Sequence, residues 1–312
     1  MRMEIGVAPE LAQALAGGEP VVALESALIT HGFAHPANLE MAQRMEAGVR
    51  QAGARPATIA VVAGEARVGI SGEELASLAS DRAACKVSLR DLPILLAPRL
   101  SDRDQARCFS GGTTVAATMY LAHRTGIRVF ATGGIGGVHR GHPEDVSADL
   151  PALASTPIVV VCAGAKAILD LPRTLEYLET LGVPVIGYGT DELPAFYSRR
   201  SGLGLDARVE TPEEVARIAQ ARTDLGLSRA VLVCVPVPEA YELPAAEAEA
   251  TIAQAVEEAE VAGVAGKALT PFLLARLVEL TGGRARRANE ALLLNNARVA
   301  ARIAQALSAT RR

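Results

Sequence analysis

The stretch TPIVVVCAGAK, residues 156–166, is a nearly continuous run of apolar, mostly β-branched residues that ends in a lysine. Runs of this kind predict strands that are covered on both faces. Similar runs, separated by longer amphipathic stretches, begin at Val21, Thr58, Ile127, Val183 and Arg229. Strand–helix alternation is typical of an α/β fold with a largely parallel sheet, so we expect that fold class.

Helix start signals support this alternation. Ser71 and Thr211 are each followed three residues later by a glutamate, which is the capping-box pattern, and Pro212 takes the first helical position. Residues 58–71 instead have the pattern of a hairpin, so the sheet is expected to be mixed. Beyond Glu242 the chain is predicted to be mostly helical. With no repeat and no Ser/Gly linker, we expect a single α/β domain over residues 1–312, with helices flanking the sheet.

Composition restricts the partners. The 312 residues carry a formal net charge of −4. The basic residues are scattered, so the sequence does not predict binding to nucleic acid. No apolar run approaches the ~20 residues that cross a bilayer, and the start of the chain lacks the apolar core of a signal peptide. The four cysteines form no C-x-x-C pair. We therefore expect no disulfide, no membrane partner and a cytoplasmic location.

Charged side chains at two strand ends are candidates for chemistry. Lys166 follows a buried strand, where apolar walls disfavour its charged form, and a neutral amine can attack a carbonyl carbon. A lysine extending to solvent from the next helix is the plain structural alternative. Glu25 closes the strand that begins at Val21, and a buried acid needs either a partner or a function. Position alone leaves both alternatives open.

Two loops could hold an anion. Residues 132–141, TGGIGGVHRG, are rich in glycine, which lets backbone amides approach an anion, and His139 and Arg140 add cationic donors. Residues 111–115, GGTTV, place hydroxyl groups at the start of a predicted helix, a suitable cradle for phosphate or ribose. A merely flexible loop is the alternative for the first segment.

The acidic segment EDVSAD, residues 144–149, alternates oxygen-bearing side chains in a way that suits a hard divalent cation. The position occupied by Leu150 would need glycine in a calcium hand, so we do not expect that motif. A turn that caps a helix would show the same spacing.

Together these segments resemble the pseudouridine-5′-phosphate glycosidase family. The resemblance is carried by ALESALITHGFAHPANLE from Ala23, KVSLRDLP from Lys86, GGTTVAATM from Gly111, FATGGIGGVHRG from Phe130 and ANEALLLNNAR from Ala288. Its most specific part is the run of residues 162–197, which includes Lys166. It extends in order from about Gly6 to about Leu307.

The resemblance implies reversible cleavage of the C–C glycosidic bond of pseudouridine 5′-phosphate to uracil and ribose 5-phosphate, with Mn²⁺ as the metal and a homotrimeric assembly. On the matching positions, Lys166 is the nucleophile, Glu25 the proton donor and Asp145 the metal ligand. The expected substrate contacts are Lys86, Thr114, Val115, Thr132, His139, Ser147, Ala148, Asp149 and Asn289. The chain departs from the family pattern at Val235, where we expect asparagine.

The implied chemistry suits these residues. Uracil C5 is a poor leaving group, so the ribose ring must open first: Glu25 protonates the ring oxygen while Lys166 attacks C1′. Two alternatives remain at this stage. A class-I-type aldolase acting on sugar phosphates would also need a Schiff-base lysine, and a non-catalytic phosphosugar sensor would bind without a covalent adduct.

Overall fold

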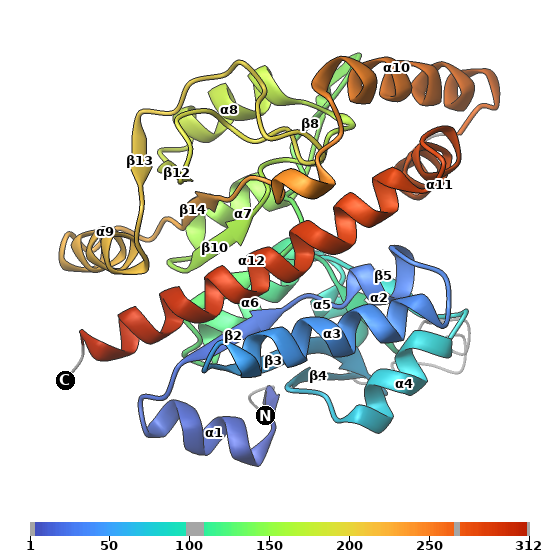
Figure 1. Ribbon diagram of the computed structural model, residues 1–312. Helices are drawn as coiled ribbons and strands as arrows, with labels where there is room; N and C mark the ends of the chain where they lie inside the picture. The colour runs from blue at the N-terminus through green and yellow to red at the C-terminus, as the bar shows by residue number, and fades with distance from the viewer. Residues whose placement is uncertain (1–3, 98–108, 265–268, 311–312) are drawn as a thin grey trace.

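The computed structural model of the chain describes residues 4–97, 109–264 and 269–310 and is built around one large sheet (Figure 1). In this part of the chain the strand order is β1-β4-β3-β2-β7-β10-β14-β12-β13, with the pair β5 and β6 beside β3. The strands are β1 (Gly6–Val7), β2 (Val21–Leu24), β3 (Arg55–Val62), β4 (Glu65–Val68), β5 (Cys85–Val87), β6 (Gly111–Thr113), β7 (Val129–Ala131), β10 (Val159–Cys162), β12 (Val185–Tyr188), β13 (Ala207–Val209) and β14 (Val231–Cys234). Each predicted strand is confirmed.

The centre of the sheet is parallel. β7 pairs with β2 on one side and with β10 on the other, and the register sets Ala131 opposite both Leu24 and Val161. The carboxyl ends of three neighbouring strands therefore reach the same level. All residues of β2, β7, β10 and β14 are buried, which explains why their sequences lack the alternation of half-exposed strands.

The sheet is mixed, as predicted. β3 and β4 form the expected antiparallel hairpin, with Ala63 and Gly64 in the left-handed region at its turn (φ 50° and 80°). β6 also runs antiparallel to β3. A separate small sheet pairs β8 (Val138–His139) with β9 (His142–Val146) and β11 (Leu169–Asp170).

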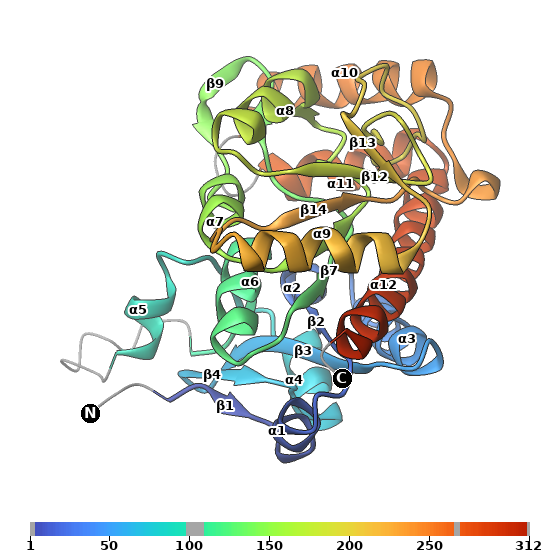
Figure 2. The same ribbon diagram turned by 90° about the vertical axis from the view of Figure 1, so that its left-hand side faces the viewer.

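Helices cover both faces of the large sheet. The long helix α12 crosses one face and packs against β2, β7 and β10, with α3 and α9 beside it (Figure 1). Figure 2 shows α6 and α7 on the opposite side of these strands. The helices are α1 (Pro9–Ala16), α2 (Ala27–His31), α3 (Ala37–Gln51), α4 (Gly72–Ser80), α5 (Leu92–Leu96), α6 (Val115–Arg124), α7 (Asp149–Ser155), α8 (Leu171–Thr180), α9 (Pro212–Asp224), α10 (Ala245–Val261), α11 (Leu269–Leu280) and α12 (Arg284–Ala309). The capping boxes predicted at Ser71 and Thr211 are both present.

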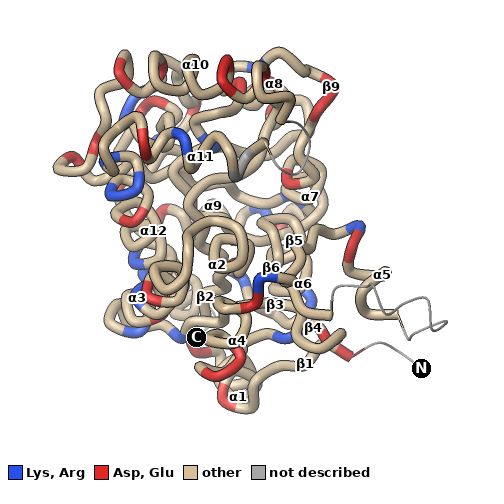
Figure 3. Tube along the Cα trace, turned by 90° about the vertical axis from the view of Figure 1, so that its right-hand side faces the viewer, with Lys and Arg blue, Asp and Glu red and all other residues tan. Residues whose placement is uncertain are grey.

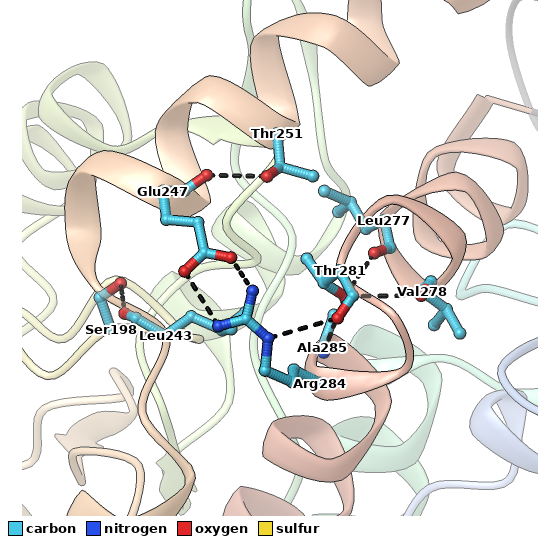
Figure 4. A network of polar contacts seen from close by, with 9 residues as sticks. All are labelled: Ser198, Leu243, Glu247, Thr251, Leu277, Val278, Thr281, Arg284 and Ala285. Carbon is cyan, nitrogen blue, oxygen red and sulfur yellow. Dashed lines mark hydrogen bonds and ion pairs between the residues drawn. The ribbon is translucent and has the colours of Figure 1, made fainter.

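The carboxyl-terminal third is helical, as expected beyond Glu242. Figure 4 shows how α10 is tied to the start of α12: Arg284 forms a bidentate ion pair with Glu247, and its Nε donates to Thr281 O over 3.3 Å. Because both charged side chains are partly exposed, the pair adds little stability and mainly fixes the orientation of the two helices.

The expectations about membrane partners and cysteines have different outcomes. Within the described ranges, no helix combines the length and apolar character needed to cross a membrane. Cys162 and Cys234 are buried free thiols, as predicted. The prediction of no disulfide is wrong at Cys85, which is disulfide-bonded. Separation along the sequence does not report which thiols meet in space.

Candidate active site

A cavity of about 400 Å³ opens where β2, β7 and β10 end. Its lining includes Glu25 after β2, Thr132 after β7 and Lys166 after β10. Parallel α/β sheets bind ligands at the carboxyl ends of strands, beside the point where chain connections diverge. The sheet thus brings together the two strand-end charges that the sequence singled out.

Glu25 is held in a buried position with a polar partner. Glu25 is only 8% exposed. The Thr132 hydroxyl donates a hydrogen bond to Glu25 Oε1. Burial raises the pKa of Glu25, because desolvation disfavours the carboxylate. The positive charge of Lys166 is the largest opposing influence, followed by the Thr132 hydroxyl. Glu25 is therefore suited to hold a proton that Lys166 can influence electrostatically.

Backbone bonds fix the loop that carries Lys166. Lys166 N–H donates to Ile135 O over 3.0 Å, and Ile135 N–H donates to Gly164 O over 3.1 Å. Gly164 has a φ of +82°, and a Cβ there would meet Pro194 O at 2.3 Å, so only glycine fits. The half-buried lysine side chain is thereby set on a rigid turn at the cavity wall.

The prediction that Arg140 joins His139 in binding an anion is wrong. Arg140 donates to Ala167 O and Leu169 O, each over 3.1 Å, and forms an ion pair with Glu249 of α10. The Arg140 guanidinium group thus stabilises the segment that follows Lys166. His139 does line the cavity.

Two glycines of the glycine-rich loop are required by close packing. A Cβ on Gly136 would lie 2.2 Å from Ser147 Oγ, and one on Gly137 would lie 2.3 Å from Thr174 Oγ1. The amides of Gly136 and Val138 already donate to protein oxygens. The loop is therefore closely packed at these positions, and Thr132 lies at its start.

Asp149 connects this loop to helix α6. Its Oδ2 accepts from Gly136 N–H over 2.8 Å and its Oδ1 accepts from Ala116 N–H over 3.0 Å. Thr114 and Val115 line the cavity beside it, and the buried Thr114 Oγ1 has no hydrogen-bond partner in the described part of the chain. A helix start with an unpaired hydroxyl suits a phosphate or ribose oxygen.

The remaining predicted substrate contacts lie at the cavity, whereas the position that departs from the family pattern does not. Lys86, Ser147, Ala148, Asp149 and Asn289 all line the cavity. Val235 is 4% exposed and is not among the described residues that line it. Its departure from the expected asparagine therefore falls in the core.

Asp145 lies apart from the other candidates. It is exposed on β9, and the described residues that line the cavity include its neighbours Val146 and Ser147 but not Asp145 itself. Both carboxylate oxygens of Asp149 accept backbone amides, so the acidic segment does not converge on one point. Across residues 4–97, 109–264 and 269–310, no group of three His, Cys, Asp or Glu side chains could hold a metal. These donors fit a mostly hydrated ion on one carboxylate, a mode that Mg²⁺-like ions accept.

Sequence reasoning missed Asn296 and Phe196. Asn296 of α12 is fully buried and donates to Thr132 O over 2.9 Å. Phe196 lines the cavity with a φ of 63°, a conformation that is rare for a bulky residue. An asparagine within the apolar run LLLNNA was a readable signal for the first. The strained backbone of Phe196 had no sequence signal.

Comparison with known proteins agrees with this geometry. The family model described as indigoidine synthase A like protein matches residues 10–306. Relatives named pseudouridine-5′-phosphate glycosidase include one from Methylobacterium nodulans, 56% identical and covering 97% of this chain and 88% of the relative. Another, from Paracoccus denitrificans, is 55% identical, with 97% and 98% covered.

Solved structures show the same fold. The prealnumycin C-glycosynthase AlnA in complex with ribulose 5-phosphate is 40% identical, with a TM-score of 0.89 over 100% of this chain and 99% of that chain. An indigoidine synthase A-like protein from Thermotoga maritima is 38% identical, with a TM-score of 0.87 over 98% and 97%. The resemblance seen in the sequence is confirmed, and the chain belongs to the indigoidine synthase A like family, together with the pseudouridine-5′-phosphate glycosidases.

Proposed function

We propose that this chain cleaves the C–C glycosidic bond of pseudouridine 5′-phosphate reversibly, giving uracil and ribose 5-phosphate. The observation that carries the proposal is the pairing of Glu25 and Lys166 in one cavity, where the lysine charge opposes the rise in the pKa of Glu25 that burial causes. The names of the relatives support the substrate, and the AlnA complex supports a site for a pentose phosphate in this fold.

The first step is ring opening. Glu25, whose pKa is raised by burial, donates its proton to the ribose ring oxygen. The amine of Lys166 forms a bond to C1′ as the C1′–O4′ bond breaks, which leaves an open-chain sugar attached to the lysine. The carboxylate left on Glu25 is then stabilised by the Thr132 hydroxyl and by the nearby lysine charge.

The second step breaks the C–C bond. The lone pair of the lysine nitrogen forms a C1′=N bond as the C1′–C5 bond breaks, and uracil C5 keeps the electrons of the broken bond and takes up a proton. Water then hydrolyses the remaining imine, releasing ribose 5-phosphate and free Lys166. The overall balance is one water consumed for each uracil formed.

The phosphate is assigned to the start of α6 and to Lys86. Thr114 supplies a buried hydroxyl that has no partner among the described residues, and Val115 and Lys86 line the same cavity. Charge has to be supplied locally, since Figure 3 shows acidic and basic residues interspersed along the chain.

A Mn²⁺ ion would be held by Asp145, which directly precedes the cavity-lining residue Val146 in the chain. When bound, it would neutralise phosphate charge. The assembly is proposed to be a homotrimer of the 32.4 kDa chain, supported by the family resemblance and measurable by light scattering.

Chromatographic measurement of uracil formed from pseudouridine 5′-phosphate, with and without Mn²⁺, tests the proposal. Release of uracil together with ribose 5-phosphate is expected. A sugar-phosphate aldolase would release a shorter aldehyde and no uracil, and a phosphosugar sensor would bind ribose 5-phosphate without turnover.

A further inference from the structure

Asn296 is an unusual residue for its place in the fold. It is 0% exposed on α12, the helix that crosses β7 and β10 (Figure 1), within a run of buried aliphatic side chains. Its Nδ2 donates to Thr132 O over 2.9 Å and contacts Gly133 O at 3.4 Å. Its Oδ1 is buried without a partner in the described part of the chain. An unpaired buried oxygen opposes folding, so the residue calls for a role that compensates for it.

The end of β7 shows what Asn296 does. Thr132 N–H donates to Val161 O, so in a regular parallel pair Thr132 O would accept from Ala163 N–H. Ala163 N–H instead donates to Gly133 O over 2.8 Å. The ladder slips by one residue, and Thr132 O is left without its strand partner. The amide of Asn296 takes that place.

Thr132, the residue at which the ladder slips, is also the residue that contacts Glu25. Leu24 and Ala131 form the last pair of β2 and β7, and Glu25 and Thr132 are the residues that follow. The Thr132 hydroxyl donates to Glu25 Oε1. The direction of this bond depends on the backbone of Thr132, and Asn296 fixes that backbone.

We propose that Asn296 is a positioning residue that acts on Glu25 through Thr132. The proposal rests on the proposed function, in which Glu25 is the proton donor. Without Asn296, the carbonyl of Thr132 would lose its hydrogen-bond donor and rotate. The Thr132 hydroxyl would then no longer be oriented to donate to the Glu25 carboxyl group.

The other charges around Glu25 are on elements other than α12. Those that act on its ionisation or line the same cavity are His31, Lys86, Arg90, Asp91, His139, Asp149 and Lys166. A substitution at Asn296 leaves all of them in place, so a change in the titration of Glu25 reports on Thr132.

The test compares Asn296→Leu, which keeps most of the side-chain volume, with Asn295→Leu at the preceding position of the same helix. We expect Asn296→Leu to lower kcat about 10- to 100-fold, less than the roughly 10²- to 10⁴-fold that complete loss of general acid catalysis costs, with KM changed less than about 3-fold. The limb of the pH–rate profile that reports loss of the Glu25 proton should move to higher pH, because the Thr132 hydroxyl lowers the pKa of Glu25. Asn295→Leu should change neither.

A double-mutant cycle tests whether Asn296 acts on Glu25 through Thr132. Thr132→Val should shift the same limb in the same direction, and adding Asn296→Leu to it should produce no further shift. Additive shifts, or an Asn296→Leu protein that loses only thermal stability, would overturn the proposal. If Asn296→Leu does not fold, Asn296→Ser is tested by the same comparison. A parent protein that releases no uracil would overturn the proposed function and this inference with it.

Discussion

At the scale of single residues, the buried carboxyl group of Glu25 is the proposed proton donor, and its burial has a cost in stability at neutral pH. Its folded pKa is raised above the ordinary 4.5, so its neutral form favours the folded state. That contribution is fully present below about pH 4.5 and is lost as pH rises through the folded pKa. Burial is the main cause, and the nearby lysines offset it only in part.

Glu25→Gln should therefore be inactive yet more stable than the parent at neutral pH, with the advantage vanishing near pH 4. Thermal unfolding between about pH 4 and pH 8 measures this difference. Exposed Glu40→Gln serves as the control and should follow the parent at every pH. A Glu25→Gln protein with the same pH dependence as the parent would contradict this view of the carboxyl group.

The proposed metal ligand Asp145 also belongs to the scale of single residues, and in the proposal it takes no part in the covalent chemistry. Asp145→Ala should weaken metal dependence while leaving formation of the lysine adduct intact, because the residue is exposed on β9 beside the cavity. Activity titrated with Mn²⁺ checks this, with the equally exposed Glu144→Ala as the matched control. Superimposable curves for Asp145→Ala and the parent would remove Asp145 from the metal site.

At the scale of elements, the glycine-rich loop depends on close approach. Gly136→Ala would drive a methyl group into Ser147 Oγ and Asp149 Oδ2, at 2.2 and 2.9 Å. Overpacking of this kind costs about 1–3 kcal/mol, and the displaced loop should also lower kcat. Chemical denaturation and turnover measure the two effects. Gly204→Ala, which meets nothing within 4 Å, should be neutral. Equal behaviour of the two variants would show that the loop yields without consequence.

Helix α6 carries the prediction about phosphate. Hydrogen bonds to a charged group are worth about 1.5–3 kcal/mol each, so pseudouridine without its phosphate should lose orders of magnitude in kcat/KM. Part of the loss should appear in kcat, because remote binding energy holds the ribose for ring opening. Steady-state kinetics of nucleoside and nucleotide compare the two. Equal values would move the phosphate away from Thr114 and Lys86.

At the scale of the whole molecule, the sequence predicted the layers and the strand-end residues well. Continuous apolar runs located β2, β7 and β10, and the rule that ligands gather at carboxyl strand ends then brought Glu25 and Lys166 together. What it could not predict were partners set by tertiary contact. Arg140 bonds to the Lys166 segment and to α10, and Cys85 is bridged, and neither is visible from spacing along the chain.

The central claim is that Lys166 forms a covalent bond to the sugar. Borohydride reduction of the protein with ribose 5-phosphate, followed by mass spectrometry of its peptides, tests it most directly. We predict a reduced sugar-phosphate mass on the peptide containing Lys166, and neither adduct nor uracil release from a folded Lys166→Ala protein. Label on another lysine, or full turnover by Lys166→Ala, would contradict the account.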